Sequence, residues 1–127
     1  MEKLKIYPQE IEARQRIAQQ YSEALSGYYH APESSVHGQK VWAQYCLRSN
    51  KRKKIITTLE QHEVPHAIYY GKPLQNQTAI LKLGVKGLDC PLSEKIAKEI
   101  FSIPMHPYLR DQDQRKVVEL LTTHLDI

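Results

Sequence analysis

Two adjacent tyrosines, Tyr69 and Tyr70, are followed at once by the run Gly71-Lys72-Pro73-Leu74. Glycine and proline force a turn there, so side chains at the end of the preceding segment can project into a cleft. A tyrosine ring packs on the face of a sugar, and its hydroxyl bonds sugar hydroxyls or a phosphate. From the pattern alone, the simpler interpretation is ordinary strand alternation, with one tyrosine in the core and the other on the surface.

The histidines offer a second kind of chemistry. His106 lies between two prolines on a predicted exposed corner, and an imidazole there could act as a general base. A structural turn histidine is the favoured interpretation, because no carboxylate or nucleophile at a short spacing orients it. His62 and His66 are four residues apart, but Pro65 breaks the helical face that a metal pair needs. We therefore expect no metal site.

Composition predicts one globular domain. The chain has 127 residues, of which 41% are apolar and 25% charged. No apolar run approaches the roughly 18 residues of a membrane helix, and from the charged start we expect no signal peptide. We expect a cytoplasmic protein with no membrane partner, in which Cys46 and Cys90 are free thiols on different elements.

A net charge of +4 and a pI near 9.0 permit attraction to nucleic acid. The most visible basic cluster is the run Lys51–Lys54, which opens a predicted helix. Positive charge is unfavourable at that end of a helix dipole, and no aromatic RNA-binding signature accompanies the run. We interpret it as solvated surface and do not expect nucleic-acid binding.

Periodicity and turn residues predict the elements that position these groups. Asn50 and Asp89 are the expected caps of two helices. The predicted fold is α+β (an α/β layer), with a small, mostly antiparallel sheet flanked by helices. The expected helices are Pro8–Leu25, Lys51–His62, a weak Leu74–Leu83, Pro91–Phe101 and Gln112–Leu125, and the expected strands are Val41–Arg48, His66–Tyr70 and Ser102–Met105.

Three segments carry a family resemblance: KVWAQYCLR (Lys40–Arg48), VPHAIYYGKPL (Val64–Leu74) and FSIPMHPYL (Phe101–Leu109). In order and spacing they resemble the C-terminal part of the pyridoxal-phosphate-dependent nucleotide-sugar aminotransferases of the DegT/StrS type. The likeness covers nearly the whole chain. It implies the fold of the C-terminal small domain of fold-type I aminotransferases.

The second segment is similar to a family loop that reads close to HYPKPLH and approaches the active site. Tyr69 takes the place of the first histidine, Gly71 replaces a proline, and Gln75 replaces the second histidine. The other positions match the family. The resemblance therefore implies substrate-binding roles for Tyr69, Tyr70, Lys72 and Gln75, and no catalytic, cofactor-binding or metal residue in this chain.

The tract Trp42-Ala43-Gln44-Tyr45 is similar to a WAQY strand of the same family. Its most economical explanation is structural. Trp42 and Tyr45 would anchor the sheet against flanking helices, and Gln44 would satisfy nearby backbone groups.

The resemblance also implies a function. The complete enzyme would move an amino group, with glutamate as donor, to a nucleotide-linked keto sugar by means of pyridoxal phosphate, as a homodimer in polysaccharide biosynthesis. Residues 1–127 would be its single C-terminal small domain, and residues 1–25 a helix linking to an absent N-terminal cofactor domain. The chain alone would close the substrate cleft, bind no cofactor and be inactive. The alternative is a stand-alone module that binds a sugar nucleotide or nucleic acid.

Overall fold

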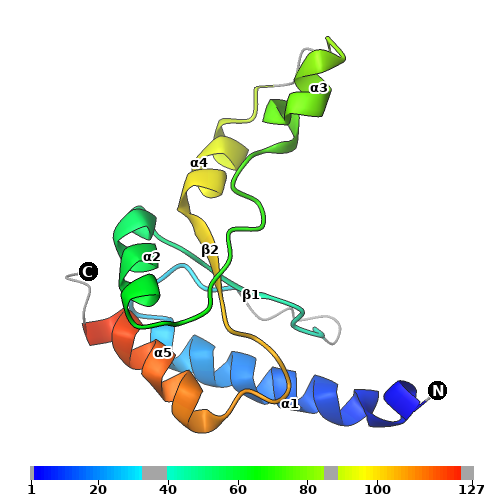
Figure 1. Ribbon diagram of the computed structural model, residues 1–127, viewed down its shortest axis with the longest axis vertical. Coiled ribbons are helices and arrows are strands. Elements are labelled where there is room, and N and C mark those ends of the chain that lie inside the picture. The colour runs from blue at the N-terminus through cyan, green and yellow to red at the C-terminus, as the bar shows by residue number, and fades with distance from the viewer. Residues whose placement is uncertain (1, 33–39, 85–88, 124–127) are drawn as a thin grey trace.

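The computed structural model describes residues 2–32, 40–84 and 89–123. Helices α1 and α5 lie side by side at one end of the molecule, and α3 lies on an arm at the other end (Figure 1). Helix α4 connects that arm to the sheet. The elements are α1 (Glu2–Leu25), β1 (Tyr45–Arg48), α2 (Arg52–Gln61), the short 3-10 helix η1 (Leu74–Asn76), α3 (Thr78–Lys82), α4 (Pro91–Glu99), β2 (Ile100–Ile103) and α5 (Asp111–Thr123).

The sheet of the described chain consists of β1 and β2, paired antiparallel. The register places Tyr45 opposite Ile103 and Leu47 opposite Phe101, and all four of these side chains are buried. A single antiparallel bridge widens the sheet at each edge. His30 pairs with Arg48 of β1, and Ala67 pairs with Ser102 of β2. The predicted fold class, a small antiparallel sheet flanked by helices, is confirmed.

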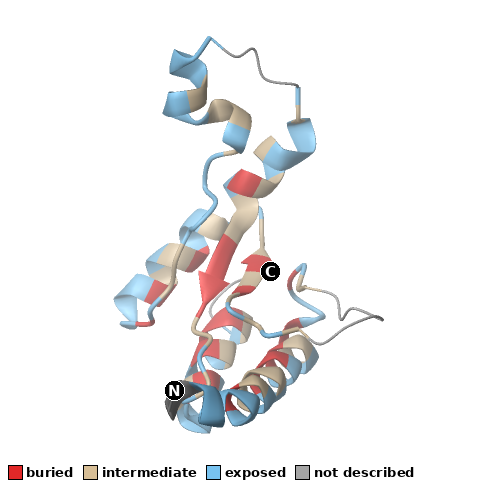
Figure 2. Ribbon diagram, turned by 90° about the vertical axis from the view of Figure 1, so that its right-hand side faces the viewer, coloured by how far each residue is buried: buried red, intermediate tan, exposed pale blue. Residues whose placement is uncertain are grey.

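The core lies where α1, α2 and α5 pack against this sheet. Ile17, Tyr21 and Leu25 recur every four residues on α1, so they share one face, and none is exposed. Buried residues gather in the sheet and on the inner helix faces, whereas the arm is mostly exposed (Figure 2). The Tyr29 and Phe101 rings meet edge to face, with centroids 6.2 Å apart.

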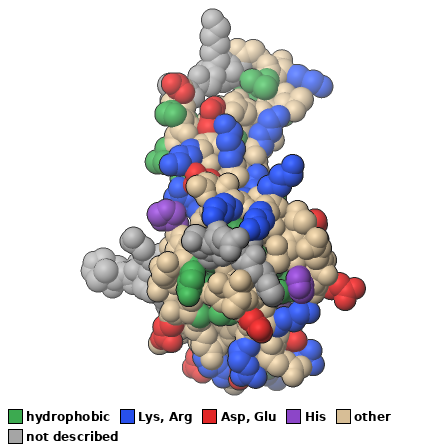
Figure 3. Space-filling model, turned by 90° about the vertical axis from the view of Figure 1, so that its left-hand side faces the viewer, with side chains coloured by type: hydrophobic (Ala, Val, Ile, Leu, Met, Phe, Trp, Pro, Cys, Tyr) green, Lys and Arg blue, Asp and Glu red, His purple; other side chains and the backbone are tan. Residues whose placement is uncertain are grey.

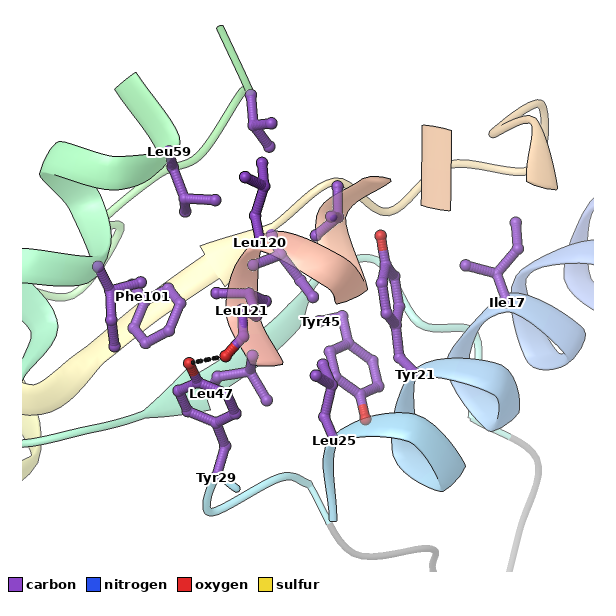
Figure 4. Packing of buried hydrophobic residues seen from close by; sticks show 14 of the residues in the cluster. Ile17, Tyr21, Leu25, Tyr29, Tyr45, Leu47, Leu59, Phe101, Leu120 and Leu121 are labelled. Atoms are coloured by element: carbon purple, nitrogen blue, oxygen red, sulfur yellow. Dashed lines mark hydrogen bonds between the residues drawn. The ribbon is translucent and has the colours of Figure 1, made fainter. Parts of the chain in front are cut away.

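Buried tyrosine hydroxyls have partners inside this core. Tyr29 Oη donates to the Leu121 carbonyl at 2.7 Å (Figure 4), and Tyr21 Oη donates to the Pro104 carbonyl at 3.1 Å. These bonds tie the C-terminal part of α1 to the β2–α5 connection, and the segment after α1 to α5. Burial raises the pKa of both phenols above the ordinary value, and that of Tyr29 reaches about 12.

We expect the chain to lose stability in alkali because of Tyr29. Its phenol has a pKa of about 12 in the folded state, against 10.0 without burial. The stabilising contribution is therefore complete below pH 10 and is lost as the pH rises towards 12, because the unfolded chain releases the proton first. At pH 11.5 the free energy of unfolding should be lower by about 2 kcal/mol from this group alone.

Urea denaturation at pH 8 and pH 11.5 measures this loss. The matched variant Tyr29→Phe has no titrating phenol, so its stability should fall less over the same interval. Equal losses in the two proteins would contradict the assignment.

Two predicted strands differ from the structure. The strand expected from Val41 begins only at Tyr45, because Trp42 has a positive φ of 46° that breaks the extended course. The strand expected at His66–Tyr70 is wrong. Only Ala67 pairs, with Ser102, and the chain turns at Tyr69 and Tyr70.

Several helix ends also differ. The first helix begins at Glu2 rather than Pro8, and Pro8 lies inside it. The helix expected to reach Phe101 ends at Glu99, and the last strand starts at Ile100 instead of Ser102. The weak helix splits into η1 and α3, with Gly84 at a positive φ of 68° beyond its end. The last helix starts one residue early, and its expected end at Leu125 lies outside the described residues.

The two predicted caps are wrong. The N-cap residues of α2 and α4 are Lys51 and Cys90 rather than Asn50 and Asp89, and neither makes a side-chain cap hydrogen bond. Cys46 and Cys90 are free thiols. Across the described ranges, no helix has the length and apolar character needed to span a membrane.

The basic run is only partly solvated surface. Lys51, Lys53 and Lys54 are exposed, but Arg52 is half-buried. Its Nη1 donates to the carbonyl oxygens of Ala97 at 2.6 Å and Ile100 at 3.1 Å. Arg52 therefore satisfies carbonyl groups at the end of α4, which is a structural role that the sequence did not indicate.

Candidate functional site

The Tyr69–Leu74 loop lies where the chain leaves the sheet for the arm (Figure 1). Tyr69 and Tyr70 are 60% and 64% exposed, so neither belongs to the core. Their ring centroids are 6.4 Å apart, with a tilt of 53°. Strand alternation, with one tyrosine buried, is therefore wrong. The loop presents two aromatic faces to whatever binds beside it.

Hydrogen bonds hold both ends of this loop. Ala67 and Ser102 exchange two backbone bonds of 3.1 and 2.8 Å, which fix its start to β2. Gln77 Nε2 donates to the Lys72 carbonyl at 3.0 Å, and Asn76 Nδ2 donates to Glu94 Oε1 at 3.1 Å. The two tyrosines therefore project from a turn that is anchored to the sheet on one side and to α4 on the other.

Space is tight at Gly71 in the middle of this turn. A Cβ atom built on Gly71 would lie 3.0 Å from Ile68 Cγ2, which is closer than ordinary van der Waals contact. The loop is therefore closely packed between Ile68 and Gly71, the position at which the family loop has proline.

A pocket of about 140 Å³ opens beside Tyr69. Most of its lining comes from two distant parts of the chain, the segment before Tyr69 and the end of β2. Both segments are brought together by the Ala67–Ser102 bridge. Ligand pockets for whole small molecules have about 300–1,000 Å³, so this one fits only part of a nucleotide sugar. It is lined by Ala43, Gln44, Pro65, His66, Ala67, Tyr69, Ser102, Ile103, Pro104 and Met105.

Of the four predicted site residues, only Tyr69 lines this pocket. Tyr70 and Lys72 are exposed on the same loop. Gln75 is half-buried at the start of the arm, and its Nε2 is a buried donor with no hydrogen-bond partner among the described residues. The four residues thus lie close together in the chain, three on the loop and Gln75 in η1, but they do not converge on one cavity.

Sequence reasoning missed His66 and Ser102 as pocket residues. His66 Nδ1 lies 3.2 Å from the Val64 carbonyl, and its Nε2 lies 3.7 Å from Glu60 Oε1. The Ser102 hydroxyl lies 3.1 Å from Cys46 Sγ. The signal for His66 was its place between Pro65 and the tyrosines, whereas nothing near Ser102 in sequence marks it.

The pocket lining contains no lysine, arginine or carboxylate. Hydroxyl, amide and imidazole groups suit hydrogen bonding to a neutral polar group such as a sugar hydroxyl. The same groups cannot form an imine with an aldehyde or pair with a pyridine nitrogen, so this site does not fit pyridoxal phosphate. Within the described residues, no three His, Cys, Asp or Glu side chains gather as a metal site.

Two aromatic residues of the family-like segment Lys40–Arg48 pack between the sheet and α1. Trp42 stacks on the buried Tyr45 at 5.5 Å, and Tyr45 Oη lies 2.8 Å from Ser22 Oγ on α1. These contacts anchor the sheet to α1, as predicted. Gln44 instead lines the pocket, and its Oε1 lies 3.8 Å from Cys46 Sγ.

His106 is exposed at a turn, where its carbonyl accepts a hydrogen bond from the Leu109 N–H at 3.2 Å. It does not line the pocket beside Tyr69. It lines a separate hollow of about 490 Å³, together with Glu10 and Arg14.

Comparisons with known proteins agree with this architecture. The chain matches the sequence profile of the DegT/DnrJ/EryC1/StrS aminotransferase family over residues 1–122. A UDP-2-acetamido-2-deoxy-3-oxo-D-glucuronate aminotransferase of Pseudomonas aeruginosa is 33% identical over 121 residues, which are 94% of this chain and 33% of that protein. A dTDP-3-amino-3,4,6-trideoxy-alpha-D-glucose transaminase of Micromonospora megalomicea is 30% identical over 115 residues, which are 86% of this chain and 31% of that protein.

Among solved structures, a DegT DnrJ EryC1 StrS aminotransferase from Brucella abortus superposes with a TM-score of 0.87 and is 41% identical. The superposition covers 94% of this chain and 32% of that one. The chain therefore spans about a third of the length of the relatives that it matches.

Proposed function

Because the chain belongs to the DegT/DnrJ/EryC1/StrS aminotransferase family, we propose that it is the C-terminal small domain of an enzyme that aminates a nucleotide-linked keto sugar. The complete enzyme uses pyridoxal phosphate, which supplies the carrier for the amino group, and glutamate is the donor. It works in the cytoplasm as a homodimer, in the biosynthesis of a polysaccharide.

The observation that carries this proposal is the family match over residues 1–122. The exposed tyrosine loop supports it, because Tyr70, Lys72 and Pro73 stand at matching positions of a family loop and the loop is free to meet a ligand. The relatives named above act on nucleotide sugars according to their names. This substrate class is the one that we extend to the complete protein.

Within that enzyme, this chain recognises the sugar. The Tyr69 ring forms one wall of the small pocket, and the Tyr70 hydroxyl and the Lys72 ammonium hydrogen-bond the substrate beyond it. The unpartnered Nε2 of Gln75 supplies a further donor once the loop closes on substrate. The domain thus contributes position and exclusion of water rather than bond chemistry.

Residues 1–127 form one domain in this proposal, and residues 1–25 are the helix that joins it to a cofactor domain. The start of α1 supports this role. Leu4, Ile6 and Tyr7 are 72%, 43% and 46% exposed, and the N-terminal half of α1 extends past the core (Figure 1). Apolar side chains at such positions are typical of a surface that another domain covers.

An assay of two proteins tests the proposal. The 127-residue chain, mixed with pyridoxal phosphate, glutamate and a UDP-linked keto sugar, should form no amino sugar, because it provides no lysine at the sugar pocket. The protein encoded together with any in-frame upstream cofactor domain should form it. Product from the chain alone, or none from the longer protein with any keto-sugar nucleotide, contradicts the proposal.

A binding measurement distinguishes a stand-alone module from a domain of a larger enzyme. A sugar-nucleotide module would hold the nucleotide sugar tightly without cofactor or a second domain, although its pocket of about 140 Å³ is small for that task. Titration calorimetry of the 127-residue chain with a UDP-sugar separates the two functions. Binding that the cofactor domain does not improve would favour the stand-alone module.

A further inference from the structure

Arg14 on α1 joins three segments that are far apart in the chain. Figure 3 shows lysine and arginine side chains spread over the upper half of one face of the molecule. Arg14 differs from such surface groups, because it is half-buried and bonds to the main chain. Its Nη1 donates to the Trp42 carbonyl at 2.9 Å and to the Met105 carbonyl at 3.3 Å. These acceptors are 28 and 91 residues away in the sequence.

Both acceptors belong to the walls of the pocket beside Tyr69. Met105 lines that pocket itself, and Ala43, which follows Trp42, lines it as well. Ala43 also lines the hollow of about 490 Å³ to which Arg14 contributes. The chain at Ala43 is therefore a wall shared by two hollows, with the sugar pocket on one side and α1 on the other. Arg14 does not line the sugar pocket but holds its walls through main-chain carbonyl groups.

The backbone of Trp42 makes this support important. Its φ of 46° lies in the left-handed region, which is unfavourable for a bulky side chain. Such a conformation persists only where its surroundings hold it. The Trp42 ring stacks on Tyr45 with centroids 5.5 Å apart, and Lys40 Nζ lies 5.0 Å from the Trp42 ring centroid. Arg14 holds the carbonyl. Without this charge-assisted bond, the course of the chain into the pocket wall is less restrained.

We propose that Arg14 is a positioning residue for sugar recognition, which sets the two walls of the pocket from the helix that joins the two domains. The inference rests on the proposed function for the identity of the substrate and of the linking helix. The hydrogen bonds that carry it lie within this chain. Its consequence is that the shape of the sugar pocket depends on the position of α1, so the linking helix and the tyrosine loop are adjusted together.

Amide NMR spectra of the 127-residue chain test whether Arg14 holds these walls. Arg14→Gln removes the charged donor and should shift the amide signals of Gln44 and Met105. Arg14→Lys keeps a charged donor and should shift them less. The matched control Arg16→Gln makes the same change of charge at an exposed position of the same helix, and should leave both signals in place. Shifts confined to α1, or equal shifts in Arg14→Gln and Arg16→Gln, overturn the inference.

Steady-state kinetics of the complete enzyme separate a positioning role from a merely structural one. Arg14→Gln should lower kcat/KM for the nucleotide sugar by about 10-fold and kcat/KM for glutamate by less than about twofold, because only the sugar uses the pocket. A loss of stability alone would reduce the amount of active enzyme and lower both values equally. Arg14→Lys should recover part of the loss, and Arg16→Gln should change either value less than about twofold.

The outcomes distinguish this inference from the proposed function. Equal losses for the two substrates in Arg14→Gln, or equal effects of Arg14→Gln and Arg16→Gln, overturn the positioning role. A complete wild-type enzyme that aminates no keto-sugar nucleotide contradicts the proposed function instead. In that case the NMR spectra of the chain still decide whether Arg14 holds the pocket walls.

Discussion

Replacing Phe101 with alanine is expected to lower the free energy of unfolding by about 3–5 kcal/mol. The side chain is 1% exposed, lies opposite Leu47 in the sheet and meets the Tyr29 ring edge to face. Its removal leaves a cavity at the point where the strands pack against α1 and α5, so collapse around it is limited. Domains of this size have about 5–15 kcal/mol in total, so most of the stability would be lost.

Urea denaturation at neutral pH measures this effect through the midpoint. Leu92→Ala is the matched control, because Leu92 is a large apolar residue that is 65% exposed on α4. We expect a change within about 0.5 kcal/mol for that variant. A loss below about 1.5 kcal/mol for Phe101→Ala would show that the sheet is not the packed centre of the domain.

The same residue shows where sequence periodicity reaches its limit. Ile96 and Ile100 have helical spacing, so the pattern continued the fourth helix to Phe101, but the chain becomes extended at Ile100. Pairing of Ile100 and Phe101 with Arg48 and Leu47 outweighs the local preference. A partner some fifty residues earlier in the chain is invisible to a local pattern, whereas α1, α2 and α5 were predicted because each buries its own regular stripe.

The site was predictable to a similar extent. The glycine and proline of the tyrosine loop indicated a turn, which the structure has, but the exposure of both tyrosines differs from the interpretation that the pattern alone favoured. The pocket beside it was not predictable, because a bridge between Ala67 and Ser102 creates it from two distant segments. The role of Arg52 was missed for the same reason, since its acceptors lie on α4 and β2.

In the complete enzyme, Tyr70→Ala is expected to lower kcat/KM for the nucleotide sugar by about 100-fold. The hydroxyl accounts for about 1–1.5 kcal/mol through its hydrogen bond, and the ring adds about 0.5–1.5 kcal/mol through packing. Since Tyr70 is 64% exposed in the chain alone, its truncation should change the free energy of unfolding by less than about 0.5 kcal/mol. Steady-state kinetics with a UDP-linked keto sugar and urea denaturation measure the two quantities separately.

Two further variants are informative. One separates the contribution of the Tyr70 ring from that of its hydroxyl, and the other compares Tyr70 with an exposed tyrosine outside the loop. Tyr70→Phe keeps the ring, so it should lose only about 10-fold in kcat/KM. Tyr28→Ala removes another exposed tyrosine, which is 47% exposed just after α1, and should change kcat/KM less than about twofold. If Tyr70→Ala changed kcat/KM as little as Tyr28→Ala, the tyrosine loop would have no part in substrate recognition.

The two substrates of the reaction provide the sharpest form of this prediction. Glutamate has no sugar ring or nucleotide, so a residue that recognises the sugar should affect kcat/KM for glutamate much less than kcat/KM for the nucleotide sugar. Tyr70 has no amine with which to form an imine, and so it cannot carry the amino group itself. Equal losses for the two substrates would therefore mean that Tyr70 acts on the chemistry common to both half-reactions, and the assignment of this domain to sugar recognition would be wrong.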